Sequence, residues 1–281
     1  MKKKPLIILT GPTAVGKTKA SIGLAKAVDG EIISADSMQV YRHMDIGSAK
    51  IKPEEMEGIP HHLIDVLEPD DEFHVVKFQQ LAKKAMREIW ERGHIPIVTG
   101  GTGFYIQALL YDIDFDENEK EEDKIDPVRS QYGNIEKDEV DMDIKMLYVE
   151  AYAREHGAEA LHEKLALVDP ASAEMIHPNN IKRVIRALEF YEQTGKRISE
   201  HNETQRQRES PYAFAYFVLT DDRAHLYERI NRRVDQMIEE GLVNEVQALK
   251  DKGYTKQLVS MQGLGYKEIL DYLDGNCTLE E

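Results

Sequence analysis

The sequence predicts an α/β fold: a parallel sheet with helices on both faces, interrupted by a helical insertion. Three observations support this fold. A glycine-rich loop at residues 11–18 follows an apolar run and precedes a helical pattern. Further apolar runs alternate with helical patterns up to about residue 111, whereas from 112 to 205 the patterns are helical. Alternating strands and helices imply right-handed crossovers and a doubly wound parallel sheet.

The glycine-rich loop is a complete G-x-x-x-x-G-K-[ST] match between a predicted strand at 6–9 and a predicted helix at 18–28. In such a loop the backbone N–H groups surround phosphate oxygens, and the helix dipole adds positive potential. The Lys17 side chain would reach the terminal phosphates, and the Thr18 hydroxyl would hold Mg²⁺. The sequence therefore predicts a P-loop NTPase-like core with a diphosphate or triphosphate site. That site would consist of Gly11, Pro12, Thr13, Ala14, Val15, Gly16, Lys17 and Thr18.

The remaining elements follow from the same patterns. Further core strands are expected at 31–35, 95–99 and 215–219, with 61–66 as a candidate fifth, and core helices at 75–92, 103–110, 224–241 and 243–252. The insertion is expected to hold helices at 144–168, 170–176 and 179–193, the last ending at Gly195, a residue type common after helix C-termini. The predicted domains are a core of residues 1–111 and 206–281 and a mostly helical insertion of residues 112–205.

The composition limits the function classes. The chain has 281 residues, a single cysteine and no apolar run long enough to span a bilayer, so we expect a cytoplasmic protein without an internal disulfide. A net charge of −16 argues against a surface devoted to nucleic acid. The charge is uneven, because residues 112–143 hold 14 acids and 4 bases, whereas residues 179–208 hold 7 bases and 4 acids. The basic stretch is interpreted either as a local RNA contact or as a solvated helix face.

Asp36 follows the predicted strand 31–35, at the edge of the sheet where open α/β folds bind ligands. From position alone it has three interpretations: a Mg²⁺ ligand, a general base, or the N-cap of a following helix. A second candidate follows strand 95–99, where three glycines surround Thr102. The glycines favour close backbone approach to a ligand, to which Thr102 would offer its hydroxyl, and the alternative is a tight turn without a ligand.

Histidine and arginine clusters complete the candidates. His61 and His62 are adjacent and would face opposite ways on a strand, so a structural role is favoured over a shared metal. Arg229 and Arg233 share one face of the predicted helix 224–241 and are interpreted either as a clamp on diphosphate or as solvated side chains. The chain lacks the Asn-Lys-x-Asp signature of guanine binding and the H-R-D and D-F-G elements of protein kinases, which argues against a GTPase and a protein kinase.

Several segments, taken together and in order, resemble the tRNA dimethylallyltransferase family. The matching segments are the P-loop, Asp36-Ser-Met-Gln-Val-Tyr-Arg42, Gly47-Ser-Ala-Lys50, His61-His-Leu-Ile-Asp65, Gly100-Gly-Thr-Gly-Phe-Tyr-Ile106, Asp169-Pro170, Ile176-His-Pro-Asn-Asn180, Arg186-Ala-Leu-Glu189 and Gly265-Tyr-Lys-Glu268. The resemblance implies transfer of a dimethylallyl group from dimethylallyl diphosphate to N6 of adenosine 37 in tRNA, with release of diphosphate. The P-loop would then hold that diphosphate, so the label "ATP-binding" would describe the motif and not the substrate.

The resemblance also implies roles for individual residues. Asp36 would be the general base, and Thr102 and Arg233 would act on the departing diphosphate, with Arg233 preferred over Arg229. The residues expected to contact tRNA are Asp36, Ser37, Met38, Gln39, Thr102, Lys182, Arg183 and Arg186. The helical insertion would grip the anticodon stem-loop, and a monomer is the expected state. Family members usually continue beyond the point at which this sequence stops.

Two other functions remain open at this stage. A small-molecule or nucleoside kinase would use the same P-loop for ATP and would not need the basic insertion helix. A non-catalytic RNA-binding module would retain the P-loop without using it, although the intact Lys17, Thr18, Asp36 and Thr102 argue against this alternative.

Overall fold

The computed structural model describes residues 3–113, 157–206 and 209–279. The chain divides into two compact units, one of residues 1–114 and 210–281 and the other of residues 115–209. The predicted helix start at 144–156 and most of the acidic stretch 112–143 lie outside the described residues.

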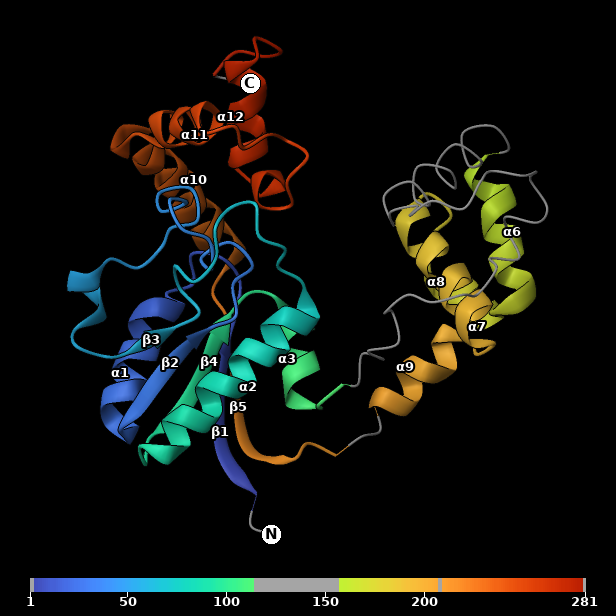
Figure 1. The fold of residues 1–281 in the computed structure, drawn as a ribbon, viewed down its shortest axis with the longest axis horizontal. Helices are drawn as coiled ribbons and strands as arrows, with labels where there is room; N and C mark the ends of the chain where they lie inside the picture. The colour runs from blue at the N-terminus through green and yellow to red at the C-terminus, as the bar shows by residue number, and fades with distance from the viewer. Residues whose placement is uncertain (1–2, 114–156, 207–208, 280–281) are drawn as a thin grey trace. The chain divides into compact units, whose positions relative to one another are not determined.

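The first unit is built on a five-stranded parallel sheet, which confirms the predicted fold class (Figure 1). Its strands are β1 (Lys4–Thr10), β2 (Gly30–Ser34), β3 (His61–His62), β4 (Ile95–Gly100) and β5 (Tyr212–Val218), in the spatial order β3-β2-β4-β1-β5. The candidate strand at 61–66 is shorter than expected, because its pairing with β2 ends at His62. The predicted strand at 215–219 begins earlier, since Tyr212 already pairs with Lys4 of β1.

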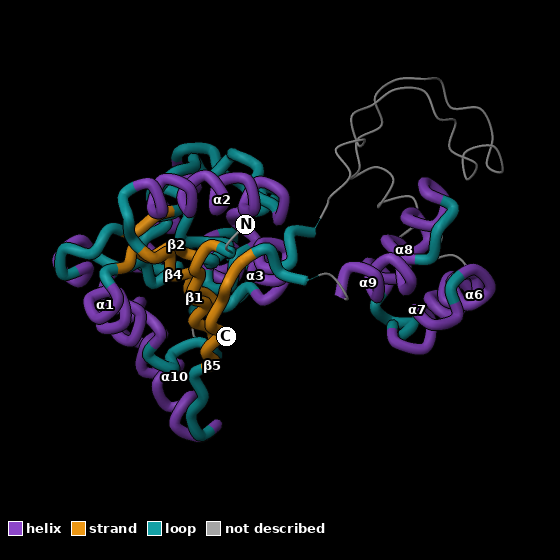
Figure 2. The backbone as a smooth tube through the Cα atoms, turned by 90° about the horizontal axis from the view of Figure 1, so that it is seen from below, coloured by secondary structure: helices purple, strands orange, loops and turns teal. Residues whose placement is uncertain are grey.

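Helices cover both faces of this sheet (Figure 2). One face carries α1 (Lys17–Val28) and the other α2 (Val75–Glu91) and α3 (Gly103–Leu110). The unit also contains α10 (Arg223–Glu240), α11 (Leu242–Asp251) and α12 (Tyr266–Leu273), which are grouped beyond the strand ends (Figure 1), and two 3₁₀ turns, η1 (Pro53–Met56) and η3 (Ser260–Gln262). Successive strand residues point to opposite faces. Ile33 and Val98 therefore pack with α2 and α3, whereas Ile32 and Ile97 pack with α1. The inner strands β2 and β4 are thus largely buried on both faces, whereas the edge strand β5 is mostly exposed.

The second unit is helical over the part that the structure describes. It contains α6 (Ala158–Val168), α7 (Pro170–Met175), α8 (Ile181–Thr194) and α9 (Ile198–Arg206). Its core consists of Leu161, Leu165, Ala173, Val184, Ile185 and Ala187. Helix α8 ends at Gly195 with φ +67°, as its sequence predicts. Helix α9 is not predicted from the sequence, because its polar residues show no apolar stripe.

Asp169 joins three of these helices. Its side chain is 0% exposed and accepts hydrogen bonds from the backbone N–H and hydroxyl of Ser172 and from those of Ser199. Burial alone raises the pKa of Asp169, but the hydrogen bonds from Ser199 and Ser172 outweigh burial and hold that pKa below its ordinary value. The carboxylate thereby ties the start of α7 to the start of α9.

We expect Asp169→Ala to lower the free energy of unfolding at neutral pH by about 3 kcal/mol, because it leaves buried donors without an acceptor. A depressed folded-state pKa contributes stability above the unfolded-state pKa of 3.8 that is lost as the pH falls through the folded-state value. The difference between wild type and variant should therefore shrink at low pH. Urea denaturation followed by circular dichroism measures both effects, with Glu174→Ala, at an exposed position of α7, as the control.

Candidate active site

The P-loop joins β1 to the N-terminus of α1 and is conformationally strained. Ala14 has φ +63° and Gly16 has φ +94°, both in the left-handed region. The ammonium of Lys17 lies across the loop and donates to the carbonyl oxygens of Gly11 at 2.9 Å and Pro12 at 2.7 Å. Gly11 admits no side chain, since a Cβ there would lie 2.6 Å from the Leu219 carbonyl oxygen. The loop is therefore compact and directs its one ammonium group toward the carboxyl edge of the sheet.

Asp36 lies at the same edge, just beyond β2. Its Oδ1 accepts hydrogen bonds from the backbone N–H of Met38 at 2.8 Å and of Gln39 at 3.4 Å. The N-cap interpretation of Asp36 is wrong, because no helix follows it in the described chain before η1. Strand β4 lies between β1 and β2, and its end is close to the end of β2, where a Cβ on Gly100 would lie 2.4 Å from the Ala35 carbonyl oxygen. The P-loop, Asp36 and Thr102 thus follow three neighbouring strands.

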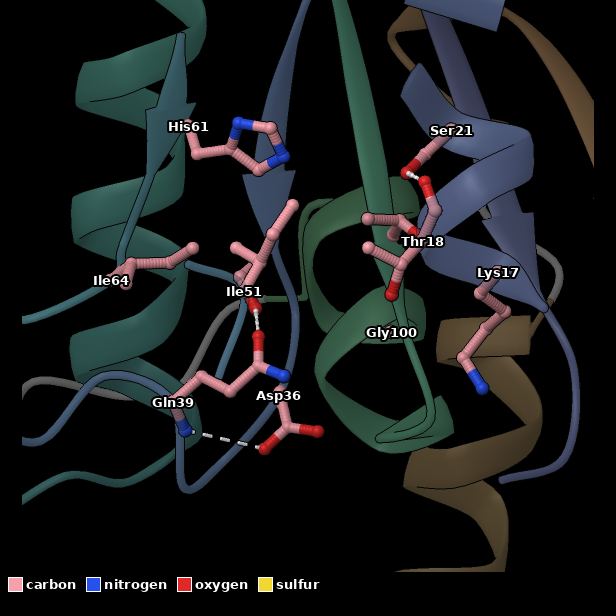
Figure 3. A pocket seen from close by; sticks show the side chains of 11 residues that line it. Lys17, Thr18, Ser21, Asp36, Gln39, Ile51, His61, Ile64 and Gly100 are labelled. Atoms are coloured by element: carbon pink, nitrogen blue, oxygen red, sulfur yellow. Dashed lines mark hydrogen bonds between the residues drawn. The ribbon is translucent and has the colours of Figure 1, made fainter. Parts of the chain in front are cut away.

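A cavity opens between these strand ends and α1 (Figure 3). Its lining residues are Lys17, Thr18, Ser21, Ser34, Asp36, Gln39, Ile51, His61, Ile64, Thr99 and Gly100. Ser34 and Thr99 are register partners on β2 and β4, two residues along from Ile32 and Ile97, so they face α1. The Thr99 hydroxyl is buried without a hydrogen-bond partner among the described residues. The cavity brings together four predicted site residues, Lys17, Thr18, Asp36 and Gln39.

Lys17 and Asp36, which line this cavity, interact electrostatically with each other and with Arg233 of α10. Burial lowers the pKa of Lys17, Asp36 opposes that effect, and Arg233 adds to it. Burial likewise lowers the pKa of Arg233, again opposed by Asp36. Two cations from different elements, the P-loop and α10, are therefore near one carboxylate. Such an arrangement suits a ligand with several negative charges, because both cations are already partly desolvated.

The three arginines of α10 have different surroundings. Arg229 forms an ion pair with Asp221 and donates to the Ala14 carbonyl oxygen at 3.2 Å, so it supports the strained P-loop from outside. Arg232 is exposed and pairs with Glu228 at 2.8 Å. Arg233, one turn after Arg229, is the arginine whose pKa responds to Asp36. Arg229 thus contacts the P-loop, whereas Arg233 interacts electrostatically with Asp36 and Lys17.

The other predicted residues are Thr102, Ser37 and Met38 of the first unit and three basic residues of the second unit. Thr102 is the residue before α3 and makes no capping hydrogen bond through its side chain. Ser37 is half-buried, and Met38 packs against Gly263, where a Cβ would lie 2.4 Å from the methionine methyl. Lys182, Arg183 and Arg186 belong to the second unit and are exposed on α8, opposite the buried Val184 and Ile185.

Sequence reasoning missed several residues at the cavity. Ser21, Ser34, Thr99 and His61 line it without having been predicted to do so. Tyr105 was also missed, although Asp36 adds to the effect of burial in raising its pKa. Tyr105 stacks on Phe78 with 4.9 Å between ring centroids. Period-2 alternation along the strands could have indicated Ser34 and Thr99, whereas the position of Tyr105 depends on how α3 packs.

The two histidines contact protein atoms. His62 Nε2 lies 2.7 Å from Glu31, which also binds Arg92 through two hydrogen bonds, and His61 Nδ1 lies 2.8 Å from the Ile59 carbonyl oxygen. No group of three or more histidine, cysteine, aspartate or glutamate side chains suited to a metal occurs among the described residues.

No helix in the described part of the chain is long and apolar enough to cross a membrane.

Comparison with known proteins assigns the chain to a family. The family model "IPP transferase" matches residues 39–281, and the model "Isopentenyl transferase" matches residues 4–69. The chain belongs to the IPP transferase family. A tRNA dimethylallyltransferase from Lachnoclostridium phytofermentans is 59% identical over 278 residues, which is 99% of this chain and 82% of that protein. The family match confirms the resemblance carried by the motifs.

Solved structures of the family agree. The full-length tRNA isopentenylpyrophosphate transferase from Bacillus halodurans has a TM-score of 0.65 at 47% identity, over 99% of this chain and 80% of that one. A eukaryotic dimethylallyltransferase, described as acting on tRNA, has a TM-score of 0.73 at 31% identity, over 97% of this chain and 64% of that one. The family fold thus extends over nearly all of this sequence.

The contact at Gly100 predicts the effect of a single methyl group. Gly100→Ala would press a Cβ against the backbone of Ala35, so we expect the free energy of unfolding to fall by about 2 kcal/mol. Gly101→Ala is the matched control, because a Cβ there meets nothing within 4 Å, and its melting temperature should equal that of wild type. Equal melting temperatures for both variants would contradict the close approach of β2 and β4.

Proposed function

We propose that this protein transfers the dimethylallyl group of dimethylallyl diphosphate to N6 of adenosine 37 in tRNA and releases diphosphate. Its family is one of prenyl-transferring enzymes, and its curated relatives are named for action on tRNA. The observation that carries the proposal is that Lys17 and Asp36 line one cavity and that both interact electrostatically with Arg233 of α10. Two cations suit the diphosphate of the donor, and one carboxylate suits the proton of the acceptor amine.

The P-loop and Arg233 would act on the diphosphate. As the bond between C1 of the dimethylallyl group and the diphosphate oxygen breaks, negative charge grows on that oxygen. Backbone N–H groups of the loop, Lys17, Arg233 and the Thr102 hydroxyl would stabilise it. The ammonium of Lys17 would exchange the carbonyl oxygens of Gly11 and Pro12 for phosphate oxygens.

A magnesium ion fits this set of donors. Thr18 and Asp36 both line the cavity with oxygen atoms, and Mg²⁺ is usually held by one or two protein oxygens together with substrate phosphates. Thr18 would hold the ion, with the diphosphate supplying further oxygens. When bound, Mg²⁺ neutralises charge on the leaving diphosphate.

Asp36 would act on the acceptor. The exocyclic amine of adenine forms a bond to C1 of the dimethylallyl group and must lose a proton, which Asp36 would accept. Backbone N–H groups hold Oδ1 of Asp36, so the carboxylate has a fixed orientation. Ser37, Met38 and Gln39 would line the pocket for the adenine, which must leave the base stack to reach it.

The second unit would bind the anticodon stem-loop. Lys182, Arg183 and Arg186 are exposed together on α8, where they would contact RNA phosphates and so position the loop without reading sequence. The acidic residues 112–143 would be unfavourable beside RNA phosphates because of their negative charge. The protein would act as a monomer in the cytoplasm.

Label transfer tests the proposal directly. The protein, Mg²⁺ and labelled dimethylallyl diphosphate are incubated with an unmodified anticodon stem-loop that carries A36-A37-A38, and label in RNA is counted. We expect transfer to A37 and a loss of about 10²- to 10⁴-fold in kcat for Asp36→Asn, which keeps the shape of the side chain but not its basicity.

Two controls define the outcomes of this experiment. A stem-loop with guanosine at position 37 should accept no label. Labelled ATP, offered in parallel with small-molecule and nucleoside acceptors, tests for a kinase. Phosphate transfer from ATP without transfer of the dimethylallyl label would overturn the proposal.

The arginines of α10 offer a second test. We expect Arg233→Gln to lower kcat by about 10²- to 10³-fold, because a charge facing the developing diphosphate is lost. Arg232→Gln is the matched control, since Arg232 is exposed and pairs with Glu228 on the same helix. Steady-state kinetics compare the kcat values of the two variants. Similar kcat values would show that Arg233 does not act on the diphosphate.

A further inference from the structure

The segment that follows β2 carries Asp36 and Gln39 but has no regular secondary structure before η1 in the described chain. Such a segment satisfies its backbone polar groups by contacts with side chains, because it lacks the regular pattern of a helix or sheet. Lys50, from within the segment, binds one such group, the Tyr41 carbonyl oxygen, and Glu245 of α11 binds three, the N–H groups of Asp45, Ile46 and Gly47.

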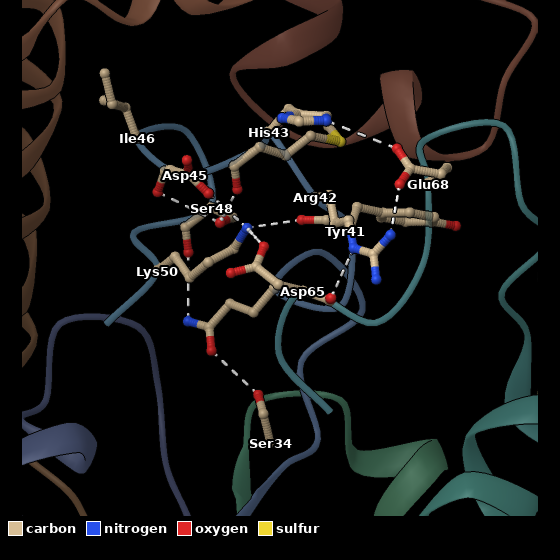
Figure 4. A network of polar contacts seen from close by, with 12 residues as sticks. Ser34, Tyr41, Arg42, His43, Asp45, Ile46, Ser48, Lys50, Asp65 and Glu68 are labelled. Carbon is tan, nitrogen blue, oxygen red and sulfur yellow. Dashed lines mark hydrogen bonds and ion pairs between the residues drawn. The ribbon is translucent and has the colours of Figure 1, made fainter. Parts of the chain in front are cut away.

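The ammonium of Lys50 has three acceptors (Figure 4). It donates to the Tyr41 carbonyl oxygen at 2.7 Å, to Asp45 Oδ1 at 2.6 Å and to Asp65 Oδ1 at 2.6 Å. The Lys50 side chain is 5% exposed, whereas the side chains of Asp45 and Asp65 are 61% and 49% exposed. An ammonium has three N–H donors, so every donor of Lys50 is used to draw distant parts of the chain together.

Gln39 is held by the same parts of the chain. Its backbone carbonyl oxygen accepts a hydrogen bond from the N–H of Asp65 at 3.2 Å, and its amide Nε2 lies 3.4 Å from the carbonyl oxygens of Ser48 and Ala49. Asp65 is an ion-pair partner of Lys50, and Ala49 is its neighbour in sequence. On the other side, the Ser34 hydroxyl donates to Gln39 Oε1 at 3.1 Å. Lys50 thus holds two of the chain parts that contact Gln39, those around Asp65 and Ala49, whereas Ser34 and Asp36 contact Gln39 independently of Lys50.

We infer that Lys50 is a positioning residue that acts through Gln39, and that it sets the acceptor base against Asp36. The inference rests on the proposed function, in which Gln39 lines the adenine pocket. Lys50 itself does not line the cavity, whereas Gln39 does. The loss of Lys50 should therefore affect binding of the acceptor and not of the donor. Lys17 and Thr18, which would bind the diphosphate of the donor, belong to the β1–α1 junction.

The segment has a second anchor that does not involve Lys50. Glu245 accepts hydrogen bonds from the backbone N–H groups of Asp45 at 2.9 Å, Ile46 at 2.8 Å and Gly47 at 3.2 Å, and from the Tyr266 hydroxyl at 2.7 Å. The Tyr266 ring fills the space at Gly47, where a Cβ would lie 2.6 Å from it. Loss of the Lys50 ammonium should therefore shift Gln39 while leaving the segment attached to α11 and α12.

The test compares Lys50→Met with Lys250→Met in the full chain. Lys250 is a matched control, because it also bridges a carbonyl oxygen, that of Leu273, and a carboxylate, that of Asp274, away from the cavity. We expect Lys50→Met to lower kcat/KM for the stem-loop by about 100-fold, the scale of a misplacement of about 1 Å, with the KM for dimethylallyl diphosphate unchanged. Lys250→Met should match wild type in kcat/KM for the stem-loop and in the KM for dimethylallyl diphosphate.

A double-variant cycle separates positioning from general destabilisation. If Lys50 acts through Gln39, adding Lys50→Met to Gln39→Ala should lower kcat/KM no further. Additive effects of the two substitutions, or an equal rise in the KM for both substrates, would overturn the inference. Should Lys50→Met fail to fold, Asp65→Asn weakens the same anchor and enters the same cycle.

Hydrogen exchange provides a readout that needs no activity. Amides of residues 37–50 should exchange faster in Lys50→Met than in Lys250→Met, with α1 unchanged. If wild type transfers no dimethylallyl label, the proposed function fails, yet the exchange comparison still decides whether Lys50 holds the Gln39 segment. Equal exchange in the two variants would overturn the positioning role.

Discussion

The close approach of β2 and β4 is the constraint on which the site depends. The N–H of Ala35 donates to the Thr99 carbonyl oxygen at 2.7 Å, and the absence of a side chain at Gly100 leaves room for this contact. Because β4 also pairs with β1, the same contact sets the distance from Asp36 to the P-loop. A carboxylate and an ammonium that are 19 residues apart in sequence thereby share one cavity.

Burial of charge makes this cavity chemically distinctive. Lys17 and Arg233 are partly desolvated beside one carboxylate, and their pKa values are lowered chiefly by burial. Cations that are already partly desolvated lose less hydration when a polyanion binds, and such prearranged charge is a main source of electrostatic catalysis. The surrounding structure maintains the arrangement, since Arg229 supports the P-loop at Ala14, where the backbone is in the left-handed region.

The irregular segment after β2 shows where sequence reasoning loses information. Asp36 could be assigned to the sheet edge from its place after an apolar run, and Gln39 from the family motif. The anchors of the segment could not be assigned, because Glu245 is about 200 residues from the N–H groups it accepts, and nothing local marks that pairing. The buried position of Lys50 also depends on carboxylates that come together only when the segment folds back on itself.

The sequence by itself determined the parallel sheet, the P-loop, the helical insertion and the family, because each depends on local periodicity or on a contiguous motif. The tertiary structure decided which groups meet. It distinguished Arg233 from Arg229, which share a helix face, by the neighbours that α10 brings to each of them. It also placed Ser34, Thr99 and His61 at the cavity. Those outcomes depend on packing between distant segments, which a one-dimensional pattern does not encode in any single stretch of residues.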